Sequence, residues 1–345
     1  MGLGRAVWVM RATGRYLGVL LCFAPFLIMW LLAPAVSQAT PPGPEPAVRA
    51  VEGAPAGGSS APAVDAVQAQ AAIYVISISK LDLRGPSFDA SFYFYVICKQ
   101  KCSPDSWELM NGKVTDKSLQ TDTPTLKVWR VTASFSFDPN FRRYPFDDQS
   151  LPIVIEHSNL TNSKMIYVPY LQYSGVDPAV TTPGWEIGQF SFTESLHHYV
   201  PFDETYSQLK FSVPLSRSTL ASISKNFVPL IIVVLLGAST LVLARNDMQL
   251  RTGGTALLAL TLFYLASTAA IPTVGYLTLW DEAVVLGYIL LFLVLLCGAV
   301  GSYLYGEGKF EGEAGKALNK RIRFWFAIAI GVLATGGSMI IVLTA

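Results

Sequence analysis

Long charge-free runs in the last third of the chain constrain its fold more than any other feature. Four stretches of 19, 29, 24 and 22 residues contain no Asp, Glu, Lys or Arg: Asn226–Ala244, Thr252–Trp280, Ala283–Gly306 and Phe324–Ala345. At roughly 1.5 Å per helical residue, each run is long enough to cross a hydrocarbon core of about 30 Å. The runs therefore predict a bundle of four transmembrane helices, which we place within residues 219–345.

The loops between these runs predict their orientation in the membrane. Asp281 and Glu282 occupy the second loop. Basic residues gather in and beside the first and third loops, at Arg245, Arg251, Lys309, Lys316, Lys320, Arg321 and Arg323. Because basic loops stay on the cytoplasmic side, we expect the region before the first helix, the second loop and the C-terminus to lie outside.

The N-terminus has the features of an export signal. Arg5, Arg11 and Arg15 precede the apolar run Leu17–Ala33, and Ser37-Gln-Ala39 then offers a cleavage site. We interpret residues 1–39 as a signal peptide, with an uncleaved membrane anchor as the alternative. Residues 40–71 are rich in Ala, Pro, Gly and Ser, which predicts a disordered linker.

Residues 72–218 have the pattern of an exported β domain. Short segments rich in β-branched and aromatic residues predict strands at Ile73–Ile78, Phe88–Val96, Val128–Phe137, Leu151–Ile155 and Gln208–Val213. Gly, Pro and Asn punctuate the intervals between them. This spacing of short strands and turns is typical of an immunoglobulin-like β-sandwich, here extracellular or periplasmic.

Composition and motifs argue against several functions. The formal net charge is +1, and the chain has no basic block of the kind that nucleic acids require. It also has no Gly-rich phosphate loop, no metal-ligand cluster and no Gly-x-Ser-x-Gly elbow, so we expect neither an enzyme nor a cofactor. His197 and His198 would point to opposite faces of a strand, which makes them a poor metal site.

Four motifs in order resemble one family of membrane proteins. They are Phe141–Leu151 with the core Tyr144-Pro-Phe-Asp147, Pro183–Ile187, Ser216–Ser218 before the first span, and Ile271–Asp281 between the second and third spans. With the outer β domain and the four spans, residues 72–345 look like a pentameric ligand-gated ion channel of the bacterial branch. The chain departs from that pattern near residues 98–107, where part of the usual ligand wall is shortened.

The resemblance implies a homopentamer in the lipid bilayer of a bacterial inner membrane. A small molecule or proton acting on the outer domain would open a pore for permeating ions, lined by the second span. The alternative is a membrane-anchored sensor or adaptor that keeps this fold without conducting.

The family pattern assigns one stripe of the second span to the pore. Its residues follow helical steps of three and four: Arg251, Thr255, Leu258, Leu262, Leu265 and Ala269. The leucines would form a hydrophobic constriction, and a ring of Arg251 side chains would favour anions unless Asp247 offsets it. The alternative is a stripe buried against other helices.

The resemblance also implies residues that couple the two halves and residues that bind the agonist. Asp147, Arg217 and the Pro272–Tyr276 loop match the coupling positions, with Asp82 as a further carboxylate near Arg217; a static ion pair is the alternative. The agonist candidates are Glu156, His157, Trp185, Tyr199, Phe202 and Tyr206, whose aromatic rings suit an amine. Their other interpretation is sandwich core and turn residues.

Two cysteines belong to the exported domain. Cys98 and Cys102 are close in the sequence and would lie in an oxidising compartment. A local disulfide is favoured over a metal site or a redox switch.

Overall fold

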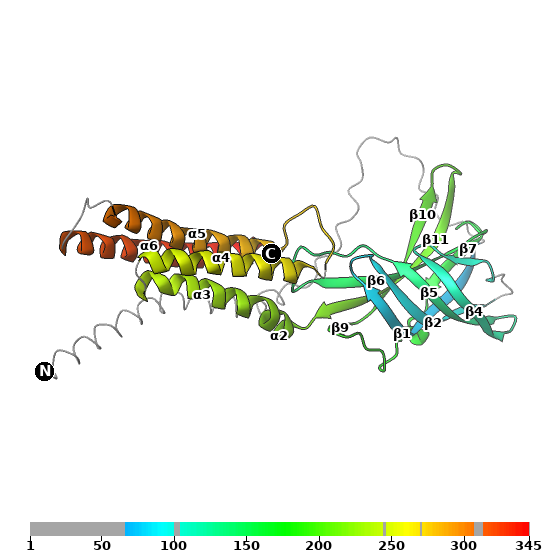
Figure 1. The fold of residues 1–345 in the computed structure, drawn as a ribbon. Helices are drawn as coiled ribbons and strands as arrows, with labels where there is room; N and C mark the ends of the chain where they lie inside the picture. The colour runs from blue at the N-terminus through cyan, green and yellow to red at the C-terminus, as the bar shows by residue number, and fades with distance from the viewer. Residues whose placement is uncertain (1–65, 100–103, 244–245, 270, 307–312, 345) are drawn as a thin grey trace. The chain divides into compact units, whose positions relative to one another are not determined.

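A computed structural model describes residues 66–99, 104–243, 246–269, 271–306 and 313–344. The predicted signal peptide and most of the predicted linker lie outside these residues. The described chain forms two compact units (Figure 1): one of strands, within residues 66–140 and 147–218, and one of helices, within residues 219–344 together with residues 141–146.

The strand unit is a sandwich of two sheets with a shared core. The first sheet has the order β4-β5-β2-β1-β7, with β8 beside β1. Its strands are β1 (Val67–Asp82), β2 (Ser87–Cys98), β4 (Gly112–Asp122), β5 (Leu126–Ser136), β7 (Met165–Pro169) and β8 (Gly175–Val176). The second sheet has the order β10-β11-β6-β3, with β9 beside β11. Its strands are β3 (Trp107–Leu109), β6 (Asp148–His157), β9 (Trp185–Ile187), β10 (Ser191–Tyr199) and β11 (Glu204–Arg217).

Alternating side chains build the core between these sheets. In β2 every second residue is buried, from Phe88 to Cys98. The inward residues of β6 and β11, including Ile153 and Phe211, pack in the same cluster. The five predicted strand segments lie in β1, β2, β5, β6 and β11, so the β-sandwich prediction is confirmed.

The end of the predicted linker is wrong, because β1 already begins at Val67. Ala69 and Ala71 are fully buried and pair with Cys98 and Val96 of β2. Small alanines can pack in a sandwich as readily as they can fill a linker, so composition alone misassigned residues 67–71.

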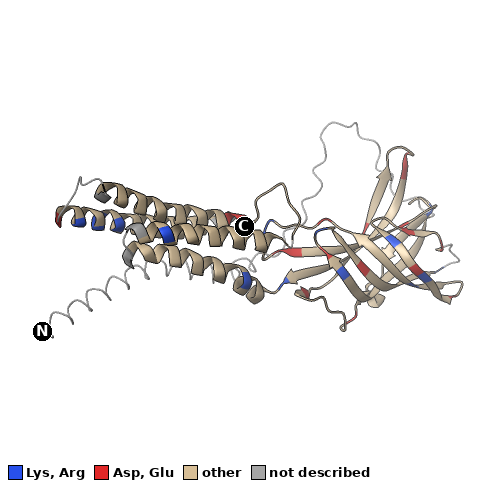
Figure 2. Cartoon of the chain, viewed as in Figure 1, with Lys and Arg blue, Asp and Glu red and all other residues tan. Residues whose placement is uncertain are grey.

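The helical unit contains four long helices. A short helix, α2 (Thr219–Ser222), leads through the π-helical turn η2 (Ile223–Phe227) into α3 (Val228–Leu243). The others are α4 (Asn246–Thr268), α5 (Leu279–Gly306) and α6 (Glu313–Thr344). Figure 2 shows that most of their residues are uncharged and that the basic residues of α6 lie near its beginning.

Three helical segments among the described residues are long and apolar enough to cross a membrane: Thr219–Leu241, Leu279–Leu304 and Glu313–Ile340. The charge-free run Thr252–Trp280 is longer than the helix within it, as the motif Ile271–Asp281 between the second and third spans implied. It contains most of α4, the loop after it and the first residues of α5. Small and polar residues such as Gly254, Thr255 and Thr261 make α4 less apolar than its neighbours, and its membrane crossing stays a prediction.

Candidate functional site

Helix α4 has one face buried by its own unit and one face exposed. Gln249 and Leu260 are fully buried, and Ala256 is 2% exposed. Leu258, Leu262 and Leu265 are 61%, 60% and 59% exposed. The other predicted pore residues, Arg251, Thr255 and Ala269, are exposed as well. The predicted stripe is therefore not buried against helices of the same chain. The side chain of Asp247 lies outside the described residues.

A polar network sets the rotation of α4 about its axis. The Gln249 amide nitrogen donates to the carbonyl of Val294 in α5, at 2.8 Å. Arg323 of α6 donates through Nη2 to Gln249 Oε1 at 3.1 Å and to the Thr240 carbonyl of α3 at 2.7 Å. Through Gln249 and Arg323 these bonds join all four helices, which helps to hold the leucine stripe on the exposed face. The motifs of the sequence did not point to Gln249.

Residues 141–146 of the signature loop are bound to the beginning of α5. The carbonyls of Arg142 and Tyr144 accept hydrogen bonds from the backbone N–H groups of Leu279 and Trp280, at 2.9 and 3.0 Å. These donors belong to the first turn of α5, where no carbonyl of the helix itself is available. The Tyr144 hydroxyl also donates to the carbonyl of Ser267 near the end of α4, at 3.2 Å.

The loop between α4 and α5 meets the same segment. The backbone N–H of Phe141 donates to the Tyr276 hydroxyl at 3.0 Å, and the Arg142 guanidinium lies 4.8 Å from the centre of the Tyr276 ring. Pro272 is half-buried earlier in this loop. Tyr276 is thus one direct partner of the signature loop, and a movement of residues 141–146 would be felt at the ends of α4 and α5.

A capping box closes the start of α5. The Thr278 hydroxyl accepts from the N–H of Asp281 at 3.2 Å, while the Asp281 carboxylate accepts from the N–H of Thr278 at 2.8 Å. Tyr264 of α4 donates to the second oxygen of this carboxylate at 2.8 Å. Asp281 therefore stabilises the helix start and ties it to α4.

The predicted ion pair between Asp147 and Arg217 is present in the strand unit. Arg217 Nε lies 2.6 Å from Asp147 Oδ1, and Gln149 donates to Oδ2 at 2.6 Å. The Asp147 side chain is completely buried, whereas that of Arg217 is 21% exposed. The guanidinium of Arg217 also lies 4.4 Å from the ring centre of Trp185. Asp82 lies at the end of β1, where its Oδ1 accepts from the backbone N–H of Arg84 at 2.8 Å.

Five of the six predicted agonist residues line one pocket of about 220 Å³ in the strand unit. They are Glu156 and His157 at the end of β6, and Tyr199, Phe202 and Tyr206 of the β10–β11 hairpin; Glu108 and Ser158 complete the lining. Phe202 at the hairpin tip is 73% exposed, so the rim is open to solvent. Trp185 lies elsewhere, beside Arg217.

Glu156 is the polar centre of this pocket. It is 2% exposed, and its Oε1 lies 2.7 Å from His197 Nδ1. Gln208 also donates to Oε1, and the Tyr199 hydroxyl donates to Oε2 at 3.0 Å. Burial, and then the hydrogen bond to Glu156, raise the pKa of Tyr199 to about 12. The hydroxyl therefore stays a donor throughout the physiological range.

The Nδ1 atom of His157 is engaged by the backbone. Its Nδ1 accepts hydrogen bonds from the backbone N–H groups of Asn159 and Leu160, at 3.1 and 3.0 Å. Cys98 takes part in a disulfide bond, and its predicted partner Cys102 lies outside the described residues. The predicted pairing of these two cysteines stays a prediction.

Sequence reasoning missed Glu108, because β3 is only three residues long and was not predicted. In the structure Glu108 is the direct cross-strand partner of Glu156. The available signal for this residue was weak: Glu108 follows Trp107 in the interval between two predicted strands.

Comparison with known proteins gives three relatives of one functional kind. The proton-gated ion channel of Gloeobacter violaceus is 22% identical over 214 residues, which are 62% of this chain and 60% of that protein. The gamma-aminobutyric acid receptor subunit gamma-4 of Gallus gallus is 24% identical over 60% of this chain and 48% of its own length. The subunit beta of the same receptor type from Caenorhabditis elegans is 25% identical over 54% of this chain and 34% of its own length.

The chain is similar in sequence to these channels and receptors. No protein-family model matches it. The chain spans less than two thirds of the length of each relative. The family resemblance and the order of a β-sandwich before membrane-capable helices are confirmed. All three are channels or receptors by name, and none is named as an enzyme.

Proposed function

We propose that the chain is the subunit of a homopentameric ion channel whose pore is lined by α4. One observation carries this proposal. One face of α4 is buried and hydrogen-bonded to the other helices, while the face with the leucine stripe is exposed. The other helices of the chain leave this stripe uncovered, so copies of it around a central axis can line a pore. A ring of leucines would close such a pore by excluding water.

Substituted cysteines test the pore assignment directly. In purified protein reconstituted in bilayers, Leu258→Cys should make the current sensitive to a charged thiol reagent, because Leu258 is 61% exposed. Leu260→Cys is the matched control, since Leu260 is fully buried and lies two residues further along α4, on the opposite face. Equal sensitivity of both variants, or of neither, would contradict the assignment.

The agonist that the outer pocket favours is a small organic amine. Glu108 and Glu156 face each other across two strands and line the same pocket, and paired like charges are more stable with a cation between them. Tyr199, Phe202 and Tyr206 add aromatic rings at the pocket wall, which attract an ammonium group. A volume of about 220 Å³ suits a ligand smaller than a typical drug.

A panel of small primary amines at constant pH tests this agonist class. We expect concentration-dependent currents in the wild type, and a response weakened at least tenfold by Glu156→Gln. Glu186→Gln, an exposed carboxylate of the same domain outside the pocket, is the control. Unchanged amine responses in Glu156→Gln would refute the pocket as the site.

Protons are the second candidate agonist, favoured by the contact of His197 with buried Glu156 at 2.7 Å. Currents evoked by lowering the pH without an amine, and lost in His197→Gln, would support them. A flat response between pH 4 and 8 would exclude them. Verified pentamers that stay silent even with Leu262→Ser would instead support the non-conducting adaptor.

Orientation and selectivity complete the proposal. We place the strand unit and the C-terminus outside a bacterial inner membrane, and Arg251 at the cytoplasmic mouth of the pore. A ring of exposed Arg251 side chains would repel cations and favour anions. Reversal potentials in asymmetric chloride should follow the anion gradient in the wild type and shift toward the cation gradient in Arg251→Glu; a wild type that follows the cation gradient would refute anion preference.

A further inference from the structure

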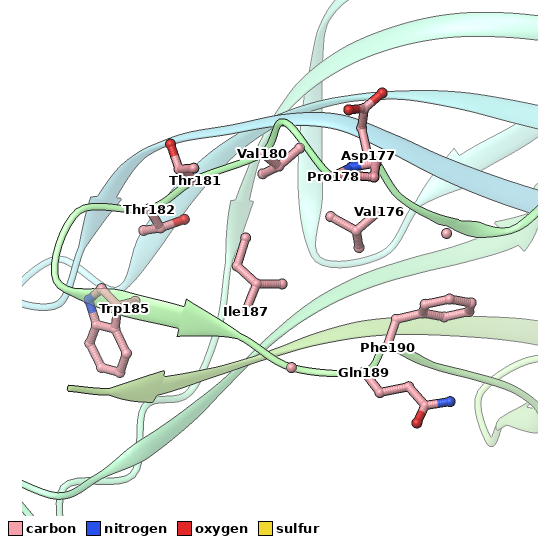
Figure 3. A pocket seen from close by; sticks show the side chains of 12 residues that line it. Val176, Asp177, Pro178, Val180, Thr181, Thr182, Trp185, Ile187, Gln189 and Phe190 are labelled. Atoms are coloured by element: carbon pink, nitrogen blue, oxygen red, sulfur yellow. The ribbon is translucent and has the colours of Figure 1, made fainter. Parts of the chain in front are cut away.

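A larger pocket of about 510 Å³ lies elsewhere in the strand unit. It is formed by residues 175–190, which run from β8 through β9 toward β10, and Figure 3 shows the side chains that line it. It shares no lining residue with the pocket at Glu156. The agonist assignment above therefore gives this second pocket no role.

The walls of this pocket extend the hydrophobic core. Val176, Val180, Ile187 and Phe190 line it, and all four also pack against the core cluster of the sandwich. The Phe190 ring stacks on Phe211, with ring centres 5.0 Å apart. Walls backed by a packed core are held in place, so this apolar side of the pocket has a defined shape.

One polar group inside the pocket is buried and has no hydrogen-bond partner among the described residues. It is the hydroxyl of Thr182, a residue that is 8% exposed. Figure 3 shows this hydroxyl directed into the space beside Val180 and Ile187. A tight turn holds Thr182 there, because Trp185 donates its backbone N–H to the Thr182 carbonyl at 3.0 Å and Gly184 has φ 82°.

The nearest carboxylate is already engaged. Asp177 accepts from the Tyr74 hydroxyl at 3.3 Å and from the backbone N–H of Ala179 at 2.9 Å. In Figure 3 this carboxylate points away from the side chains of Val176 and Ile187. The interior of the pocket thus offers apolar contacts and the unpartnered Thr182 hydroxyl, while the Asp177 carboxylate is held by other partners.

We infer that this pocket binds a small, uncharged, largely apolar molecule with one hydroxyl group that hydrogen-bonds to Thr182. A buried polar group without a partner is costly, so a ligand hydroxyl gains more there than at a solvated site. An aromatic alcohol has the required apolar body and single polar end.

The same pocket touches the ion pair that we expect to couple the two units. Trp185 lines the pocket, and the Arg217 guanidinium lies 4.4 Å from its ring centre. Arg217 in turn holds Asp147 at 2.6 Å. A ligand that shifts Trp185 alters its contact with Arg217 and therefore the ion pair of Arg217 with Asp147. The bound alcohol should thus modulate the channel. This effect rests on the proposed function, whereas binding does not.

Binding is tested by photolabelling the full-length protein in lipid nanodiscs with a diazirine-bearing benzyl alcohol. We expect labelled residues within 175–190, located by mass spectrometry, and competition by benzyl alcohol. Thr182→Val should weaken this competition about two- to tenfold, the worth of one hydrogen bond. Thr193→Val, at an exposed position of β10 outside the pocket, should leave it unchanged.

A second variant fills the pocket with a larger side chain. Ile187→Trp should abolish labelling at residues 175–190 in protein that elutes as the wild type does. Labelling confined to the helices, or labelling at 175–190 that neither Thr182→Val nor Ile187→Trp reduces, would overturn the inference.

Currents separate this inference from the proposed function. Benzyl alcohol should shift the agonist response of the wild type at least twofold and leave that of Ile187→Trp unchanged. Specific labelling in a protein that never conducts would refute the channel and keep the site. Normal currents without labelling at 175–190 would refute the site and keep the channel.

Discussion

Replacing Asp147 by Asn should destabilise the strand unit strongly, although the two side chains have nearly the same size. The carboxylate accepts two short hydrogen bonds, from Arg217 Nε and from Gln149, each at 2.6 Å. In Asp147→Asn one of these donors must face the new amide NH₂ group, because asparagine has one oxygen to offer. At least one charge-assisted bond is then lost, which costs about 1.5–3 kcal/mol.

The Arg217 charge also loses its carboxylate partner, and this adds to the cost. Truncating one partner of a fully buried pair costs about 3–5 kcal/mol, but the Arg217 side chain is 21% exposed and water screens it in part. We therefore expect Asp147→Asn to lower the free energy of unfolding by about 3 kcal/mol, at the lower end of that range. At about 2–4 °C per kcal/mol, the midpoint of thermal unfolding should fall by about 6–12 °C.

A double-mutant cycle isolates the pair. Asp147→Asn, Arg217→Gln and the double variant are compared by tryptophan fluorescence of the detergent-purified full chain at one heating rate. Because the double variant leaves no uncompensated charge, its loss should be smaller than the sum of the single losses by about 1–2 kcal/mol. Additive losses would refute the reasoning.

The same variants separate a structural from a gating role. If the pair transmits the agonist signal, Asp147→Asn should assemble as a pentamer and lose much of its agonist response at a temperature well below its unfolding midpoint. Loss of assembly would indicate a static structural pair instead.

Two further predictions concern the strand unit. Tyr199 has a folded-state pKa of about 12, above the ordinary value of 10.0, so its stabilising contribution is complete below pH 10 and is lost as the pH rises toward 12. Glu156→Gln should lower this pKa and move the phenolate absorbance change to lower pH, a shift that should vanish in a Tyr199→Phe background. Gly112→Ala should cost about 1–3 kcal/mol, because a Cβ there would lie 2.5 Å from the Phe135 ring and 2.9 Å from a strand carbonyl. Gly85→Ala, whose Cβ would meet a side chain at 3.4 Å, should leave the unfolding midpoint nearly unchanged.

The signature motifs could be recognised from the sequence because they are contiguous. Asp147 and Tyr276 each lie in a short motif, and so these candidate coupling residues could be named before any contact was known. The helical stripe could be named as well, since steps of three and four residues place Leu258, Leu262 and Leu265 on one side of any helix.

Local patterns could not place groups that meet only through folding. Glu108 faces Glu156 because β3 pairs with β6, and a three-residue strand has too little periodicity to be detected. The assignment of Trp185 to the agonist site stays a prediction: in the structure it lies beside Arg217 and lines the other pocket. Long-range pairing decides such neighbours, and pairing depends on many residues at once.

The sequence by itself determined the order of the two units: a β domain followed by helices that suit a membrane, with motifs in an order that resembles ligand-gated channels. Charge-free length and strand alternation are one-dimensional properties, and burial from water imposes them directly on the order of residues. Only the tertiary structure decided which face of α4 stays exposed and which polar groups share a pocket. The hydrogen bonds of Gln249 join residues far apart in the chain, and the apolar walls around Thr182 pack against the sandwich core, so their energies exist only once that core is packed.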